Sequence, residues 1–149
     1  MFSSVLIAVD SWEYTTDLLD LAKRVCADAK MVDLIYVDSR LPEKPEFFHY
    51  TDDFAQLVLT ADTSQQQIIQ DALCYLSMTA GIQAKGVLMG GDAAASIVKY
   101  AKEINCDVII MGHRNLPAIS RFFDPSIALK VLKKAHCPVL LDSTAKLDS

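Results

Sequence analysis

The sequence MGHRNLPAISRFFDPSIALKVLKKAHCPVLL, residues 111–141, decides the fold of this chain. It reads as the end of one strand, a loop, a helix and a last apolar strand. Asp124 and Pro125 are typical of a helix start, with the carboxylate as N-cap and the proline at the first helical position. Parallel α/β sheets bind ligands at the carboxyl ends of their strands, so we expect a candidate site in this stretch.

The rest of the chain repeats the same alternation of short apolar runs and amphipathic segments. A Pro-containing segment, residues 38–50, is expected to be a connecting loop. The order βαβαβαβαβ predicts one Rossmann-like open parallel five-stranded sheet with helices on both faces, in a single domain over residues 1–149 whose last residues, 143–149, form a frayed tail. The predicted strands are 5–9, 31–37, 82–89, 107–111 and 138–141, and the predicted helices are 13–29, 52–78 (one helix, or two broken near 62–64), 92–104 and 127–135.

Composition excludes several functional classes. The net charge of -5 disfavours nucleic acid, because such binding neutralises many phosphates. No apolar run approaches the ~20 residues of a membrane span, and the N-terminal apolar run lacks the features of a signal peptide, so we expect a cytoplasmic protein.

Sulfur and imidazole groups also carry no recognisable motif. The scattered cysteines include no CxxC pair and no histidine at ligand spacing, so reduced core thiols are expected and no metal site is predicted. The histidines have no recognisable base or metal partner, and no catalytic residue is predicted. The cysteines are Cys26, Cys74, Cys106 and Cys137, and the histidines are His49, His113 and His136.

Established nucleotide motifs of α/β proteins are missing. The first strand is followed by Asp10-Ser11-Trp12-Glu13 and not by a P-loop or a GxGxxG dinucleotide motif. The third predicted strand ends at Met89-Gly90-Gly91, where a receiver domain would need a phosphorylatable Asp. These three classes are therefore excluded.

Four segments resemble the universal stress protein family. They are VLIAVD (5–10), Gly91-Asp92, AKEINCDVIIMG (101–112) and VLKKAHCPVLL (131–141), and together they span nearly the whole chain in the right order. The resemblance implies a small stress-response protein that forms a homodimer through its last strand. Val139, Leu140 and Leu141 agree with this, because an apolar edge strand needs a partner or a cover.

The nucleotide-binding members of that family carry Gly-x-x-Gly, nine residues, then Gly-Ser or Gly-Thr after the fourth strand. Gly112 and Ser126 match this pattern, whereas Asn115 and Pro125 replace two of its glycines. Asn115 adds a side chain where a phosphate approaches. Pro125 lacks the backbone N–H that a helix N-terminus offers to phosphate.

The resemblance further implies that Asp10 lies near the adenine and ribose and that Val37 packs against the base. Two functions stay open. The first is a non-enzymatic stress-response module with a degenerate nucleotide motif, for which no cofactor is expected. The second is a protein that binds ATP, ADP or AMP and is at most a weak ATPase. Its site would consist of Asp10, Val37, Gly112, Arg114, Asn115 and Ser126, with arginine replacing lost donors.

Overall fold

A computed structural model describes residues 2–9, 12–49, 64–112 and 125–142 of the chain. Strands and helices alternate along most of this sequence. The strands are β1 (Ser4–Ala8), β2 (Met31–Asp38), β3 (Glu46–His49), β4 (Lys85–Gly90), β5 (Val108–Gly112) and β6 (Val139–Asp142), and the helices are α1 (Trp12–Val25), α3 (Ser64–Ala80), α4 (Ala93–Ile104) and α5 (Pro125–Lys134).

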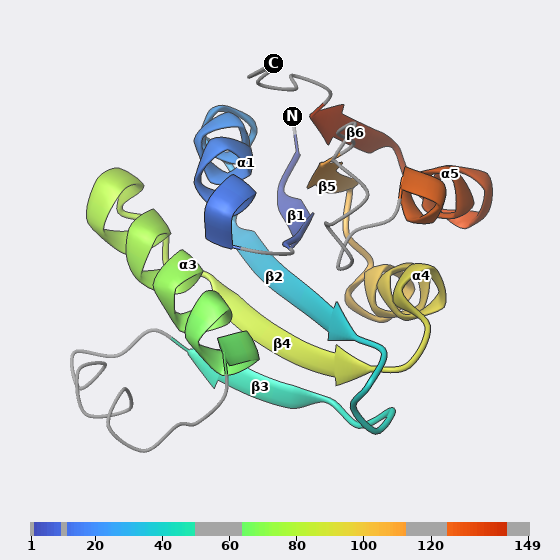
Figure 1. The fold of residues 1–149 in the computed structure, drawn as a ribbon. Coiled ribbons are helices and arrows are strands. Elements are labelled where there is room, and N and C mark those ends of the chain that lie inside the picture. The colour runs from blue at the N-terminus through green and yellow to red at the C-terminus, as the bar shows by residue number, and fades with distance from the viewer. Residues whose placement is uncertain (1, 10–11, 50–63, 113–124, 143–149) are drawn as a thin grey trace, which may run out of the picture.

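The strands form one sheet in the order β3-β4-β2-β1-β5-β6 (Figure 1). Five of them are parallel, which confirms the predicted Rossmann-like parallel sheet. The sixth strand, β3, is antiparallel to β4 and lies inside the segment predicted as a loop, so that part of the prediction was wrong. The two prolines precede β3, and Phe47 and Phe48 favour an extended edge segment.

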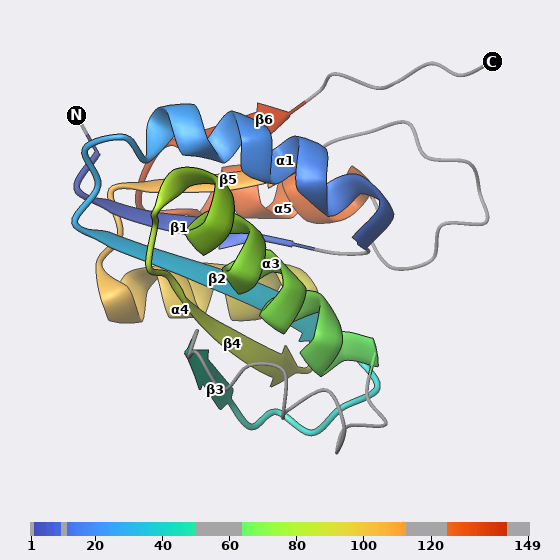
Figure 2. The same cartoon turned by 90° about the vertical axis from the view of Figure 1, so that its left-hand side faces the viewer.

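Among the described residues, α1 and α3 cover one face of the sheet, and α4 and α5 cover the other (Figures 1 and 2). Val5 and Ile7 of β1 face the layer that contains α1 and α3, whereas Leu6 and Ala8 face α4 and α5. This alternation follows from the two-residue period of a strand. Both faces of β1 are therefore buried, and its short apolar run has no polar position.

The helix ends agree with several local signals. Asp92 is the N-cap of α4, and its carboxylate accepts a hydrogen bond from the N–H of Ala95 at 2.9 Å. Asn105 ends α4 in the left-handed conformation, with φ 51°. Helix α5 begins at Pro125, as the Asp124-Pro125 start signal predicts, and two residues before the range 127–135 expected from the apolar spacing. Helix α1 ends at Val25, four residues earlier than expected. Among the described residues, no helix is both long and apolar enough to cross a membrane.

Candidate functional site

The carboxyl ends of the parallel strands lie together at one edge of the sheet. Ala8 of β1 is level with Ile35 of β2 on one side and with Met111 of β5 on the other. The chain runs from β1 outward through β2 and β4, then crosses to β5 on the opposite side of β1 (Figure 1). The topological switch point is therefore between β1 and β5, where ligands of such sheets bind.

Gly112 ends β5 beside this switch point. A Cβ atom added to Gly112 would meet no described atom within 4 Å. Its φ is also outside the left-handed range that only glycine adopts readily. Neither packing among the described residues nor backbone conformation requires a glycine here. As far as the described residues are concerned, the backbone here is open to the close approach of a ligand.

The β4 side of the same edge is closed by the segment between β2 and β3. A Cβ atom on Gly90 would lie 2.1 Å from the carbonyl oxygen of Leu41 and 2.2 Å from that of Pro42. At Gly91, which has φ +95°, it would lie 2.7 Å from the Glu43 side chain. These contacts fill the space directly against the backbone of Gly90 and Gly91.

Asp38, the last residue of β2, fixes the start of that closing segment. Its buried carboxylate accepts hydrogen bonds from Arg40 through the backbone N–H at 2.9 Å, Nε at 3.0 Å and Nη2 at 2.8 Å. Gln65 of α3 adds a fourth bond at 2.7 Å. The Arg40 guanidinium and these donors hold the pKa of Asp38 well below its usual range. The carboxylate therefore binds groups of the protein itself and stabilises the fold, although the end of a strand is a position where ligands often bind.

The residues predicted for a nucleotide site are only partly described. Val37 is partly buried near the end of β2, and Ser126 is partly buried at the second position of α5. With Gly112 they lie at the carboxyl ends of strands or at the helix start that follows. Asp10, Arg114 and Asn115 lie outside the described residues.

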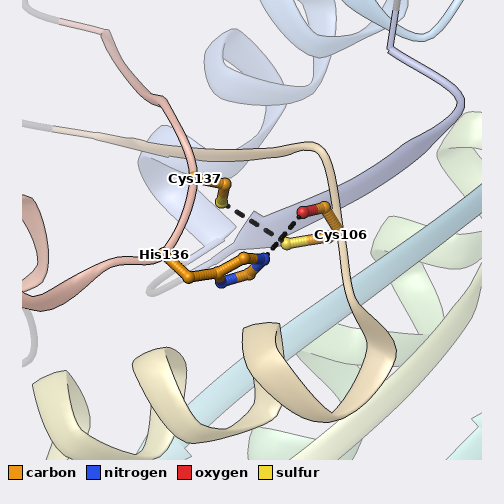
Figure 3. Close-up of side chains that lie close together, drawn as sticks. All are labelled: Cys106, His136 and Cys137. Atoms are coloured by element: carbon orange, nitrogen blue, oxygen red, sulfur yellow. Dashed lines mark hydrogen bonds between the residues drawn. The ribbon is translucent and has the colours of Figure 1, made fainter.

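A second group of chemically reactive side chains lies at the opposite, amino end of β5 and β6. The Sγ atoms of Cys106 and Cys137 are 3.8 Å apart, and Nε2 of His136 lies 3.0 Å from the carbonyl oxygen of Cys106 (Figure 3). One ligand atom from each residue lies within 4.8 Å of the others. Burial raises the pKa of the Cys106 thiol to about 12 and also raises that of Cys137.

The spacing of these residues along the chain does not indicate the group, because Cys106 lies 30 and 31 residues from the other two members. Cys26 and Cys106 are buried thiols, as expected, but His136 does have thiol neighbours, in contrast to the prediction. The parallel register pairs Ile109 with Val139, so Cys106 is level with His136 when that register is extended by three residues. The pairing of the last two strands was the available signal.

Comparison with known proteins identifies the family of this doubly wound α/β protein. The model of the universal stress protein family matches residues 1–142. The chain belongs to the universal stress protein family.

Individual relatives agree with this assignment. A universal stress protein of Bacillus subtilis is 23% identical, and the match covers 95% of this chain and 99% of the relative. One from Methanocaldococcus jannaschii is 34% identical over 61 residues, which are 41% of this chain and 36% of that protein.

Solved structures share the fold. A universal stress protein in complex with cAMP has a TM-score of 0.66 at 15% identity, and the match covers 96% of this chain and 98% of the other. A family protein from Arabidopsis thaliana with AMP bound has a TM-score of 0.59 at 16% identity, with 98% and 94% covered.

Proposed function

We propose that this chain is a non-enzymatic stress-response module of the cytoplasm whose nucleotide site is degenerate, so that it does not bind ATP in the manner usual for the family. The observation that carries the proposal is the position of Pro125. It is the first residue of α5, the helix that follows β5 beyond the switch point. A phosphate held at this N-terminus would lose one backbone donor, because proline has no N–H.

Charge adds to the loss of the donor. Asp124 directly precedes α5 in the sequence. At ~4 Å and an effective dielectric constant near 20, two like charges repel by about 4 kcal/mol. A single hydrogen bond contributes only about 1 kcal/mol, so the repulsion outweighs several such bonds. A triphosphate is therefore a poor ligand for this helix start.

Binding of an adenine nucleotide is the second candidate function, and it is favoured by Gly112, where no described atom would crowd an added Cβ. The solved relatives with cAMP and AMP show that members of this fold hold such ligands. On this hypothesis Asp10, Val37, Gly112, Asn115 and Ser126 contact the nucleotide, and Arg114 replaces a lost donor.

A thermal unfolding experiment with and without MgATP separates the two functions. A ligand at 100 times its Kd stabilises the folded state by about 2.7 kcal/mol, or about 5–10 °C in Tm for a chain of this size. At millimolar MgATP we expect the Tm to rise by less than about 1 °C. A dose-dependent rise of several degrees would establish the second function. AMP and cAMP, which carry fewer phosphates, are measured in parallel.

A restoring variant tests the physical cause. If Asn115 and Pro125 weaken the site, the double change Asn115→Gly with Pro125→Gly creates or strengthens the response to MgATP. Asn115→Gly alone is the matched control, because it retains Pro125 and therefore still lacks the backbone N–H at that position. A folded double variant that still gives no response would show that the defect lies elsewhere.

We further propose a homodimer formed through β6. This strand pairs only with β5 among the described strands, and Val139, Leu140 and Leu141 are all partly exposed. Leu129 and Leu132 of α5, the neighbouring helix, expose 54% and 45% of their surface. An apolar edge with such neighbours favours pairing with a second copy.

A further inference from the structure

The group Cys106, His136 and Cys137 comes from two separate segments that strand pairing brings together. Cys106 lies between α4 and β5, and His136 and Cys137 lie in the turn between α5 and β6. The β5–β6 ladder holds both segments in register. Ile109 donates its N–H to the carbonyl oxygen of Pro138 at 3.0 Å, one residue beyond Cys137. The backbone pairing of β5 with β6 therefore fixes the positions of Cys106 and Cys137 relative to each other.

The separation of the two sulfurs can be compared with the distances that a shared metal ion and a disulfide require. Zn–S bonds are about 2.3 Å long, and two of them at a tetrahedral angle place the sulfurs about 3.75 Å apart. The observed Sγ–Sγ distance is 3.8 Å. A disulfide needs about 2.05 Å, so the sulfurs would have to approach by roughly 1.8 Å. At this separation the two free thiols share an S–H···S hydrogen bond, and they would need almost no movement to bind one cation, whereas an S–S bond would require them to approach.

The imidazole of His136 supplies a third ligand. Its hydrogen bond to the carbonyl oxygen of Cys106 keeps the ring beside the thiols (Figure 3). In a tetrahedral site a sulfur and a nitrogen ligand lie about 3.6 Å apart, so a ring nitrogen at most 4.8 Å away would move by about 1 Å. His136 is exposed, so core packing does not oppose this movement.

We propose that Cys106 Sγ, Cys137 Sγ and one ring nitrogen of His136 bind a Zn²⁺ ion, with water as the fourth ligand. Two thiolates and an imidazole suit a thiophilic cation such as zinc. The neighbouring carboxylate of Asp107 is committed elsewhere, because its Oδ2 accepts hydrogen bonds from Ser3 and Ser4 at 2.9–3.0 Å. Partial exposure of Cys137 leaves a path for the ion and for water.

Binding has a defined proton balance. Zn²⁺ replaces the protons of two thiols, which pass to solvent, and the dication with two thiolates is electrically neutral. No oxidant or reductant takes part. The site lies at the amino ends of β5 and β6, at the opposite edge from Gly112, so it does not depend on the proposed nucleotide chemistry.

The test is a zinc titration of the full, chemically reduced chain against a chromophoric chelator. We expect one Zn²⁺ per chain and release of two protons per ion in weakly buffered solution near pH 7. Cys137→Ser should lower the affinity at least about 100-fold, since even the loss of an outer-shell partner costs about 10- to 100-fold. His136→Ala, at an exposed position, should lower it by about 10-fold or more. Cys74→Ser is the matched control, because that thiol lies outside the group, and it should bind like the parent chain.

Cobalt provides an independent readout. Co²⁺ bound to thiolates gives a charge-transfer absorption, which should appear in the parent chain and in Cys74→Ser but not in Cys137→Ser. Circular dichroism confirms that the variants are folded. Unchanged affinity in folded Cys137→Ser or His136→Ala would overturn the proposal. A reduced chain that takes up no zinc would also overturn the proposal. Formation of a Cys106–Cys137 disulfide on air oxidation of such a chain would assign the two thiols to redox chemistry instead.

Discussion

Gly90 and Gly112 both end inner strands at the carboxyl edge of the sheet, yet they differ in the space available for a side chain. Gly90 lies directly against the backbone of Leu41 and Pro42, whereas no described atom crowds Gly112. The sequence alone makes the two positions look alike, because each is a glycine after an apolar strand. Only the path of the segment between β2 and β3 distinguishes them.

Gly90→Ala should therefore destabilise the protein. Its new methyl group would meet a carbonyl oxygen at 2.1 Å, and the backbone on that side has to move. Overpacking of this kind costs about 1–3 kcal/mol. Gly112→Ala is the control and should change the free energy of unfolding by no more than about 0.5 kcal/mol. Urea unfolding measures both, and equal losses in the two variants would contradict this account of the edge.

Residues with a local signal were predictable. Asp92 and Pro125 mark helix starts through rules that depend on adjacent positions, and the structure places both as expected. The group of Cys106, His136 and Cys137 was not predictable from spacing, because 30 and 31 residues separate its two segments. Its members meet only through the pairing of β5 with β6.

At the scale of elements, β6 has one row of backbone groups that pairs with no other strand in the described part of the chain. The carbonyl oxygen of Pro138 accepts a hydrogen bond from the N–H of Ile109 in β5, so this carbonyl points toward β5. Because the N–H and C=O groups of successive residues point to alternate sides of a strand, the N–H groups of Val139 and Leu141 face away from β5. These donors are the ones that a second copy would use.

Leu141→Pro should weaken the proposed dimer without removing a bond between β5 and β6. Each copy loses one outward donor, and two hydrogen bonds of about 1 kcal/mol correspond to roughly a 30-fold rise in Kd. Leu141→Ala is the control for lost packing, since it retains the N–H group. Analytical ultracentrifugation measures both. A parent chain that stays monomeric at high concentration would rule out the interface, and equal effects of the two variants would rule out backbone pairing.

The element that sequence reasoning missed is β3. Its four residues include two phenylalanines, and Phe47 is 56% exposed while Phe48 packs against the core. This gives no hydrophobic alternation long enough to indicate a strand. Two nearby prolines favoured a loop instead. The strand forms because β4 offers an open edge, which is a property of the assembled sheet.

At the scale of the whole molecule, two buried carboxylates act on stability in opposite directions. Asp33 accepts a hydrogen bond from the Tyr100 hydroxyl at 2.9 Å, and Lys85 Nζ lies 3.7 Å away. Its other oxygen, Oδ1, has no hydrogen-bond partner among the residues that the structure describes. Burial raises the pKa of Asp33 above its usual 3.8, whereas the Arg40 guanidinium lowers the pKa of Asp38 below that value.

The stabilities of Asp33→Asn and Asp38→Asn, relative to the parent chain, should therefore change in opposite directions with pH. A raised pKa means that the contribution of Asp33 is full below pH 3.8 and is lost as the pH rises through its folded value. Asp33→Asn should gain stability relative to the parent chain between about pH 3 and pH 7. The contribution of Asp38 is present above pH 3.8 and is lost as the pH falls, so Asp38→Asn should be less stable at pH 7 and approach the parent chain at low pH. Urea unfolding at both pH values measures the two trends, and parallel trends would contradict these assignments.

The overall architecture was the most predictable property of the chain. Five apolar runs alternate with amphipathic segments, and right-handed crossovers leave few other arrangements. The candidate nucleotide site was predictable only as a location, the switch point beside Gly112. The closure of the β4 side depends on contacts between residues far apart in the chain, namely Gly90 with Leu41 and Asp38 with Gln65, so no local sequence pattern predicts it.

The short antiparallel strand β3 has a further consequence for assembly. It occupies one border of the described sheet with only four residues, among them the charged Glu46, and charged, short borders resist pairing with other chains. The opposite border, β6, is apolar. Growth of the sheet by addition of further copies is thus favoured in one direction only. Two copies that join through β6 by twofold symmetry use up that border on both sides, so association ends at a closed pair instead of continuing into a fibre.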